Sequence, residues 1–396
     1  MTPPLDDGTK QKSPPATSRA GSCVHSLWNI FILSCRRLDG KSNHALLKDQ
    51  RQPFRYSSHL VFRPVMTISS GSKTFLPQAI PESSVMSIRP VKMQSQARPH
   101  IEGAGVHLHR VFGFGETEPF DPFLMMDDFR NDYPEMYEKG FPWHPHRGIE
   151  TITYVLKGNV EHGDSLGNRG VLSDGDVQWM TAGSGIIHQE MPSGNADGQM
   201  HGFQLWANLP SHQKMITPRY QDIKSGDITT LTDDDGTDIR IIAGDWRGYR
   251  GPVDGIDTDP SYLDIAMPAN TTKRFPFDTR RQGFAYIFEG SALFDNASTP
   301  FGVNVEKEFN GEELKIRDQS GNRTLVVFGD GDEVVVTSGE TGVRFLLISG
   351  APLREPVAWH GPIVMNTRAE LQQAFSELNK GTFIKTGAEG WVNTPE

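Results

Sequence analysis

Cysteine is almost absent from this chain. Only two of its 396 residues are cysteines, Cys23 and Cys35, and both lie near the amino terminus. Residues 101–396 therefore hold neither a disulfide framework nor a cysteine-ligated metal site. Two cysteines do not by themselves indicate a redox compartment.

Long hydrophobic runs are also missing. The longest candidate, residues 27–33, is far shorter than the roughly 18–20 apolar residues that a membrane-spanning helix needs. The sequence therefore predicts no membrane partner. Gly (40 residues) and Pro (27 residues) are plentiful instead, which is typical of a turn-rich, mostly β protein.

Basic charge is scarce in the larger part of the chain. Residues 101–396 carry 25 Lys and Arg against 44 Asp and Glu, a net charge of −19. A surface of this sign repels the phosphate backbone of nucleic acids, so no direct nucleic-acid binding is expected.

Residues 1–85 differ in composition from the rest of the chain. Residues 1–100 carry 14 Lys and Arg against 5 Asp and Glu, a net charge of +9, and Ser and Pro are frequent. A basic, Ser-rich, acid-poor segment is typical of an organelle-targeting peptide. A disordered leader without an address, or a translated stretch ahead of Met66 or Met86, explains the same composition.

Short apolar runs alternate with Gly, Asp and Asn turns from about residue 99 onward. Runs such as 148–156, 284–288 and 333–337 have the length of strands, and their spacing predicts an all-β sandwich or barrel. A helical pattern appears mainly at Thr367–Leu378, where Thr367 and Glu370 predict a capping box.

One β unit occurs twice in the sequence. The segment 154–158 (YVLKG) resembles 286–290 (YIFEG), and the motif 174–176 (DGD) recurs at 330–332. Two copies of one unit explain this pattern. We expect a first domain at residues 86–225 and a second at residues 250–390.

Two polar clusters in the first copy are the strongest functional signal. His144 and His146 form one pair, and His188 and Glu190 form the other. Residues two apart on a strand point to the same face, so two neighbouring strands can direct four ligands at one point. The sequence therefore predicts a metal site.

Three imidazoles and one carboxylate suit a divalent first-row metal, with Fe(2+) favoured. Iron(II) reaches five or six coordination and keeps open positions, whereas a four-coordinate structural zinc is closed. Zinc, manganese, copper and nickel accept the same donor types. Glu150, at even spacing from His146, is treated as a spare ligand or as an outer residue that supports the ligands.

The second copy lacks this ligand set. Counting from the repeated motifs transfers the four ligand positions to Pro276, Asp278, Arg344 and Leu346. At most one of these can bind a metal, so we expect the second domain to be without one. Six other histidines are interpreted as satisfied structural residues: His107, His109, His162, His201, His212 and His360. The turn at 183–185 (GSG) fits either a plain turn or a close approach of backbone to a bound ligand.

The residues around both clusters resemble the pirins, a branch of the cupin superfamily. The resemblance is carried by residues 141–156 (FPWHPHRGIETITYVL), 175–183, 187–192, 201–210 and 360–367, and it extends over roughly 86–385. It implies two jelly-roll-type cupin β-barrels in tandem with a short C-terminal helix. It also implies iron in the first barrel, held by residues matching His144, His146, His188 and Glu190. A typical cupin uses the glutamate matching Glu150; pirins use the one matching Glu190.

Two functions follow from the resemblance. Some pirins are similar to quercetin 2,3-dioxygenases, which open a flavonol with O2 and release carbon monoxide. Glu190 would then be a ligand and, on detaching, the base for the 3-hydroxyl proton, and the rings would lie against Phe141, Trp179, Met180 and Met191. The alternative is a non-catalytic, redox-sensing nuclear cofactor that binds a transcription factor, with Arg147 and the acidic surface as candidates for the reporting surface. A monomer in the nucleus or cytoplasm is expected.

Overall fold

The computed structural model describes residues 86–294, 319–320 and 322–385, and the expected leader at 1–85 lies outside these ranges. β-Strands are the main secondary structure of the described part, as predicted, and α2 (Arg368–Asn379) is its α-helix. The capping box is confirmed, because the Thr367 side chain accepts from the Glu370 N–H while Glu370 Oε2 accepts from the Thr367 N–H.

Two sheets form the first barrel. A seven-stranded sheet runs in the order β12-β9-β6-β11-β4-β3-β2, and a four-stranded sheet runs β5-β10-β7-β8. Short 3-10 helices occupy Glu118–Phe120, Pro134–Met136 and Ser211–Gln213. The strands are β2 (Arg98–Glu102), β3 (Val106–Phe112), β4 (Phe123–Asp128), β5 (Phe141–His146), β6 (Ile149–Lys157), β7 (Asn159–Asp164), β8 (Arg169–Leu172), β9 (Val177–Thr181), β10 (Ile186–Ser193), β11 (His201–Asn208) and β12 (Arg219–Ile223).

One nine-stranded sheet forms the second barrel. Its main order is β1-β21-β19-β22-β17-β14-β13, with β18 paired to β22 and β20 paired to β19. A 3-10 helix at Ser225–Asp227 precedes β13, and β15 (Asp245–Trp246) and β16 (Tyr249–Arg250) form a separate hairpin. The strands are β1 (Val91–Gln96), β13 (Thr229–Thr232), β14 (Asp238–Ala243), β17 (Ser261–Met267), β18 (Thr272–Pro276), β19 (Gln282–Phe294), β20 (Gln319–Ser320), β21 (Thr324–Phe328) and β22 (Glu333–Gly350).

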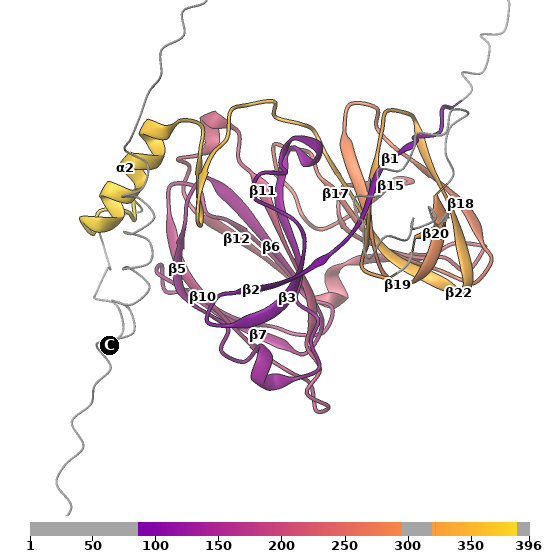
Figure 1. Ribbon diagram of the computed structural model, residues 1–396, viewed down its shortest axis with the longest axis horizontal. Helices are drawn as coiled ribbons and strands as arrows, with labels where there is room; N and C mark the ends of the chain where they lie inside the picture. The colour runs from indigo at the N-terminus through magenta and orange to yellow at the C-terminus, as the bar shows by residue number, and fades with distance from the viewer. Residues whose placement is uncertain (1–85, 295–318, 321, 386–396) are drawn as a thin grey trace, which may run out of the picture. The chain divides into compact units, whose positions relative to one another are not determined.

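The ends of the described chain are exchanged between the two barrels. Strand β1 precedes the first barrel in sequence but pairs antiparallel with β21 of the second, where Val91 lies opposite Phe328. In the other direction, β23 (Ala358–His360), β24 (Ile363–Met365) and α2 follow the second barrel but contact the first, through a bridge between Ile363 and Arg147. Figure 1 shows β1 among the second-barrel strands and α2 near β5. The division at 86–225 and 250–390 is kept as a proposal, with these exchanged ends.

A shared hydrophobic core joins the barrels. Ile152, Trp179 and Phe203 of the first barrel belong to one buried cluster with Phe284 and Leu346 of the second. Two reciprocal hydrogen bonds cross the same junction: the Tyr154 hydroxyl donates to Asp264 Oδ2 at 2.6 Å, and the Tyr286 hydroxyl donates to Asp128 Oδ2 at 2.8 Å. The two tyrosines are the equivalent residues of the sequence repeat, so the junction follows the repeat.

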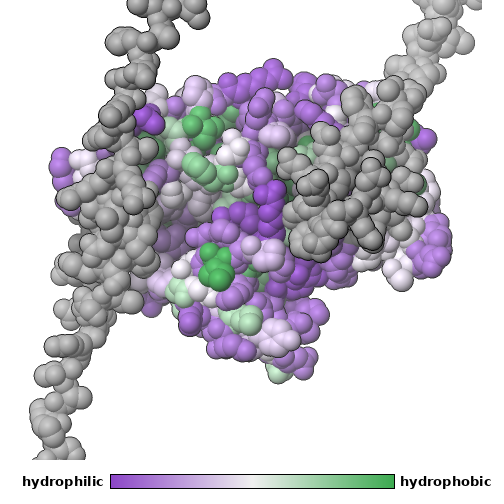
Figure 2. All heavy atoms as spheres, in the orientation of Figure 1, coloured by the Kyte–Doolittle hydropathy of each residue, from purple (hydrophilic) through white to green (hydrophobic). Residues whose placement is uncertain are grey.

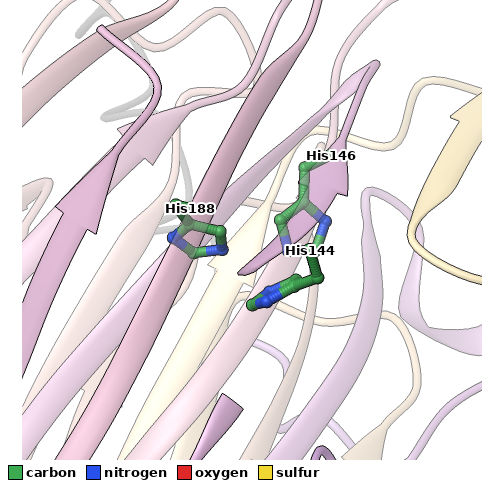
Figure 3. A group of neighbouring side chains, drawn as sticks. All are labelled: His144, His146 and His188. Atoms are coloured by element: carbon green, nitrogen blue, oxygen red, sulfur yellow. The ribbon is translucent and has the colours of Figure 1, made fainter. Parts of the chain in front are cut away.

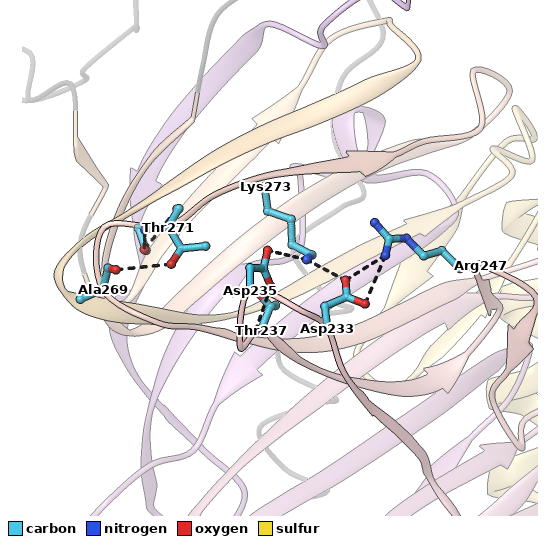
Figure 4. Close-up of polar contacts among 8 residues, drawn as sticks. Asp233, Asp235, Thr237, Arg247, Ala269, Thr271 and Lys273 are labelled. Carbon is cyan, nitrogen blue, oxygen red and sulfur yellow. Dashed lines mark hydrogen bonds and ion pairs between the residues drawn. The ribbon is translucent and has the colours of Figure 1, made fainter.

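Aromatic side chains fill the second barrel. Trp246 contacts Phe275, and Phe345 contacts both Phe275 and Phe294. The ammonium of Lys273 is paired with Asp233 and Asp235, each at 2.7 Å, as Figure 4 shows. The buried charge next to this core is therefore neutralised within the barrel, as buried charges require.

The described surface is largely polar. Figure 2 shows mostly hydrophilic residues on one face, with separate hydrophobic groups among them. No helix in the described ranges is both long and apolar enough to cross a membrane.

Candidate metal centre

Three imidazoles meet at one point of the first barrel. One ligand-competent nitrogen each from His144, His146 and His188 lies within 4.8 Å of the others, and this trio is the metal-competent group found among the described residues. The ring centroids are 4.4 Å apart for His144 and His188, and 5.0 Å apart for His146 and His188. Figure 3 shows the two rings of one strand facing the ring of its neighbour.

Strand pairing brings the three rings together. In the antiparallel pair of β5 and β10, His188 lies directly opposite His144, and Ile186 lies opposite His146. Because alternate residues on a strand share a face, His144 and His146 both project towards His188. The sequence prediction that the two clusters occupy neighbouring strands is confirmed for these three residues.

Burial keeps these imidazoles neutral. His188 is fully buried, His146 is 2% exposed and His144 is half-buried. Loss of hydration lowers the pKa of His144, and it lowers the pKa of His146 and His188 well below the usual value. A neutral imidazole has a free lone pair, which is the form that binds a metal.

The hydrogen bonds of the trio fit a metal. His144 Nδ1 lies 2.9 Å from the Pro142 carbonyl oxygen, and His146 Nδ1 lies 3.1 Å from that of Pro362, which leaves Nε2 of each ring for another partner. His188 has no hydrogen bond on either nitrogen although the ring is buried. An unsatisfied buried polar group costs about 1–3 kcal/mol, a cost that a metal bond to His188 would remove.

Glu190 lies beside the trio rather than within it. It follows His188 by two residues on the buried face of β10, but a register shift in the pairing with β5 separates the two positions. Thr153 Oγ1 donates to Glu190 Oε1 at 3.0 Å and also lies 2.7 Å from Gln204 Oε1; its single proton serves one oxygen at a time. Burial raises the pKa of Glu190 to about 7. Its role as the fourth ligand stays a prediction.

Glu150 lies on the other face of its strand. Thr153 of β6 contacts Glu190, whereas Ile152 and Tyr154 belong to the core between the barrels. Glu150 shares the face of Ile152 and accepts a hydrogen bond from Thr181 Oγ1 at 2.7 Å. The interpretation of Glu150 as a spare ligand is therefore wrong, because odd and even residues of β6 point in opposite directions.

The same alternation corrects other residues near the site. Trp179 belongs to the core between the barrels, and Met191 lies on the opposite face of β10 from Glu190. Neither can line a space at the imidazoles in this conformation. Arg147 is 1% exposed and bonded inward, so it does not form a reporting surface.

The glycines of the turn at 183–185 pack closely against other parts of the protein. A Cβ on Gly183 would lie 2.2 Å from the Ile216 carbonyl oxygen, and a Cβ on Gly185 would lie 3.0 Å from the Phe383 ring. The groups that closely approach this turn are the protein's own Ile216 and Phe383. Approach of the backbone to a bound ligand stays a prediction.

His162, which the sequence interpretation treated as a structural residue, lies near the candidate site. It lies opposite Glu190 in the pairing of β7 with β10, and its ring is 5.1 Å from the Tyr220 ring. Its Nδ1 is buried without a hydrogen bond, as are His109 Nδ1 and His201 Nε2, so one ring nitrogen of each lacks a partner, whereas His109 Nε2 contacts Arg323 Nη1 at 3.0 Å. The available signal was the pair His162 and Asp164, whose i, i+2 spacing matches that of the two clusters.

Comparison with known proteins identifies the family. The family model described as Pirin matches residues 105–207, and the model of the pirin C-terminal cupin domain matches residues 262–384. A pirin-like protein of Caulobacter vibrioides is 41% identical over 299 residues, which cover 75% of this chain and 100% of that protein. This chain belongs to the pirin family. Human pirin is 37% identical over 309 residues, covering 77% of this chain and 97% of that protein.

Two further pirin relatives carry an enzyme name. A Pseudomonas aeruginosa protein with the provisional name quercetin 2,3-dioxygenase is 40% identical over 287 residues, covering 72% of this chain and 94% of that protein. A crystal structure described as quercetin 2,3-dioxygenase from Acinetobacter baumannii matches with a TM-score of 0.65 and 28% identity, covering 75% of this chain and 99% of that chain. These comparisons confirm the tandem cupin fold.

The positions transferred to the second cupin by counting along the sequence do not match the strands of the structure. In the second cupin, β18 pairs with the first part of β22, in the same way that β5 pairs with β10 in the first cupin. Arg344 and Leu346 lie in the later part of β22, which pairs with β17 instead. Pro276 is exposed, and Asp278 accepts hydrogen bonds from Arg280. The buried residues of β18 are Lys273 and Phe275, so Pro276 lies on the wrong face of that strand. Arg344 and Leu346 lie in the wrong part of β22, so the transferred positions are wrong.

Proposed function

We propose that this chain is a metal-dependent dioxygenase of the quercetin 2,3-dioxygenase type, which opens the heterocycle of a flavonol with O2 and releases carbon monoxide. The observation that carries the proposal is the buried trio of His144, His146 and His188, with Glu190 beside it. The names of the relatives from P. aeruginosa and A. baumannii support the substrate class.

Iron(II) is the metal that we propose for this site. His144, His146 and His188 would hold it, and Glu190 would supply the carboxylate, a donor set that suits iron and other first-row divalent metals. A bound metal of this kind supplies Lewis acidity, which lowers the pKa of the flavonol 3-hydroxyl, and a redox-active centre for O2. Four protein ligands would leave room for a small molecule at a metal that takes more than four ligands.

The chain's own residues handle the proton. Glu190, on detaching from the metal, would accept the proton of the 3-hydroxyl at a carboxylate oxygen, which requires hydrogen-bond distance between the two groups. Thr153 orients that carboxylate through its 3.0 Å hydrogen bond to Oε1. One flavonol and one O2 give one ring-opened ester and one carbon monoxide, so the reaction needs no external reductant.

The test is anaerobic reconstitution of the full chain with Fe(2+), Mn(2+), Co(2+), Ni(2+), Cu(2+) or Zn(2+), followed by quercetin and air. We expect the flavonol absorbance to disappear with stoichiometric carbon monoxide release for at least one metal. The matched control is His188→Ala treated in the same way, which should remain inactive. No turnover with any metal whose stoichiometric loading has been measured would reject the enzyme proposal.

The alternative of a redox-sensing nuclear cofactor stays a prediction. Its proposed reporting residue, Arg147, is buried in the described structure, so another surface would have to contact the transcription factor. Absence of turnover together with a metal-dependent change in binding to a protein would favour this alternative. Nuclear or cytoplasmic location and the monomeric state are likewise predictions.

A further inference from the structure

The chain crosses from the second cupin back onto the first in its last described part. This C-terminal strap comprises β23, β24, α2 and the following residues, 358–385. Ile363 and Phe383 are buried. Ile363 forms a bridge with Arg147, and the Val364 N–H donates to the Arg147 carbonyl at 3.1 Å. The strap therefore borders directly on the turn that follows His146.

One backbone group of the strap reaches His146 itself. The Pro362 carbonyl oxygen lies 3.1 Å from His146 Nδ1. A carbonyl only accepts, so this contact requires the proton on Nδ1 and leaves the Nε2 lone pair for a metal. Outer hydrogen bonds of this kind fix the tautomer and orientation of histidine ligands in metal sites.

Arg147 ties the strap to the first cupin. Its Nη1 donates to Glu377 of α2 and its Nη2 to the Phe383 carbonyl, both at 2.7 Å, while Nε donates to the Ser184 carbonyl at 2.7 Å. The guanidinium also lies 4.1 Å from the centroid of the Phe383 ring. A planar guanidinium with partners in three segments fixes their relative positions.

A second tie lies at the next residue. Lys214 Nζ donates to the Gly148 carbonyl at 2.8 Å and to the Val364 carbonyl at 3.2 Å, and it is 2% exposed. Both residues that follow His146 are therefore joined to the strap. The position of Pro362 relative to His146 is set from two sides.

We propose that the C-terminal strap completes the metal centre of the first cupin, with Pro362, Arg147 and Glu377 as positioning residues. Pro362 selects the His146 tautomer that presents Nε2, and the pair of Arg147 and Glu377 holds Pro362 in place. This inference rests on the metal site of the proposed function. None of the three residues touches the metal; each acts through His146.

The first test is the tautomer of His146 in the full, metal-free chain. A long-range ¹H–¹⁵N correlation spectrum distinguishes a protonated Nδ1 from a protonated Nε2, and His146→Gln assigns the signal. We expect Nδ1 to be protonated in the wild type, with a shift towards a tautomer mixture in Glu377→Ala. A wild-type His146 protonated on Nε2 would overturn the proposal.

The second test compares two carboxylates of α2 by their effect on Co(2+) affinity, measured by competition with a chelator. Glu377 contacts Arg147, whereas Glu370 belongs to the capping box and contacts Thr367. Outer-residue changes usually cost 10–100-fold in metal affinity, so Glu377→Ala should weaken Co(2+) binding by about that factor. Glu370→Ala loosens the helix without removing the tie and should stay within twofold of the wild type.

Equal affinity losses in both variants would show that the strap acts only through general stability, and unchanged affinity in Glu377→Ala would reject the proposal. If Glu377→Ala does not fold, Glu377→Gln serves instead, because it keeps the side-chain length and removes the charge. If quercetin is not turned over but Glu377→Ala still weakens Co(2+) binding, the enzyme proposal is rejected and the strap proposal is retained. If the wild type binds no Co(2+), the metal site and the strap proposal that rests on it are both rejected.

Discussion

The hydroxyl of Tyr154 in the first cupin donates a 2.6 Å hydrogen bond to Asp264 of the second. Asp264 is 2% exposed and also accepts from Arg344 at 2.7 Å. Burial and the neighbouring carboxylate both raise the pKa of Tyr154, so the phenol stays protonated and keeps donating. The junction between the cupins thus combines apolar packing with a hydrogen bond to a buried charge.

Tyr154→Phe should destabilise the protein by about 1.5–3 kcal/mol, the range for hydrogen bonds to charged groups. The change removes one oxygen and keeps the ring, so the packing in the shared core is preserved. Chemical unfolding measures the difference. Tyr249→Phe at an exposed position is the control and should change stability by less than about 0.5 kcal/mol. Equal stability of Tyr154→Phe and the wild type would contradict the role given to this bond.

His188→Leu should separate metal binding from stability. The imidazole is buried without a hydrogen bond, so its replacement by an apolar side chain should leave the metal-free protein at least as stable as the wild type. With a metal at 100 times its Kd, the wild type should gain about 2.7 kcal/mol and the variant nothing. Unfolding with chelator and with metal, beside metal analysis, measures both effects.

Asp278→Ala is the control for the single metal site. Asp278 lies in the second cupin, accepts from Arg280 and is not part of the group of three imidazoles. This variant should keep full metal stoichiometry, whereas His188→Leu should lose it. Loss of metal in both variants would contradict a single site in the first cupin.

His201 predicts an acid-dependent loss of stability. Burial lowers the pKa of His201 to about 4, below the value of about 6.5 for an unfolded chain, so the unfolded state takes up the proton first as pH falls. The wild type should lose stability between about pH 6.5 and pH 4, by about 3 kcal/mol in total from this residue. His201→Phe removes the effect and keeps a ring beside Phe203 and Phe288.

The measurement is the difference in unfolding free energy between wild type and His201→Phe from pH 8 to pH 4. The value at pH 8 reports packing alone and serves as the internal control. As pH falls, the unfolding free energy of the variant should rise relative to that of the wild type. A difference that does not vary with pH would contradict a buried, neutral His201.

Gly148→Ala should loosen the strap. Gly148 has φ of +77°, and a Cβ there would lie 2.0 Å from the Val364 carbonyl oxygen. Gly167 has φ of +90° with open space around it, so Gly167→Ala is a matched control that carries only backbone strain of about 1–3 kcal/mol. Gly148→Ala should cost more than the control and make residues 358–385 more sensitive to protease. Equal effects of the two changes would contradict the close contact with the strap.

Local patterns predicted the parts of the site that depend on a single strand. The i, i+2 spacing of His144 and His146 was enough to place both rings on one face, and residue type alone predicted the capping box at Thr367. The register of a strand relative to its partners is a longer-range property. One residue of error reverses the face, which is why Glu150 and Trp179 were assigned to the wrong side of their strands.

Contacts distant in sequence could not be predicted. His146 meets Pro362 across 216 residues and Arg147 meets Glu377 across 230. Counting did not transfer the ligand positions correctly to the second cupin, because its strand β22 is 18 residues long. This single strand takes the place of two strands of the first cupin, β10 and β11. No local pattern marks such a fusion.

The exchange of ends has a consequence for how the chain melts and for how it can be divided. A fragment that stops near residue 225 would retain β1 without β21 and lack the strap, and the complementary fragment would lack β1. Each half lacks a segment that completes its fold, so the two cupins of the repeat are expected to unfold together in one cooperative transition. Calorimetry should record one transition, and separately expressed halves should recover a native spectrum only when mixed.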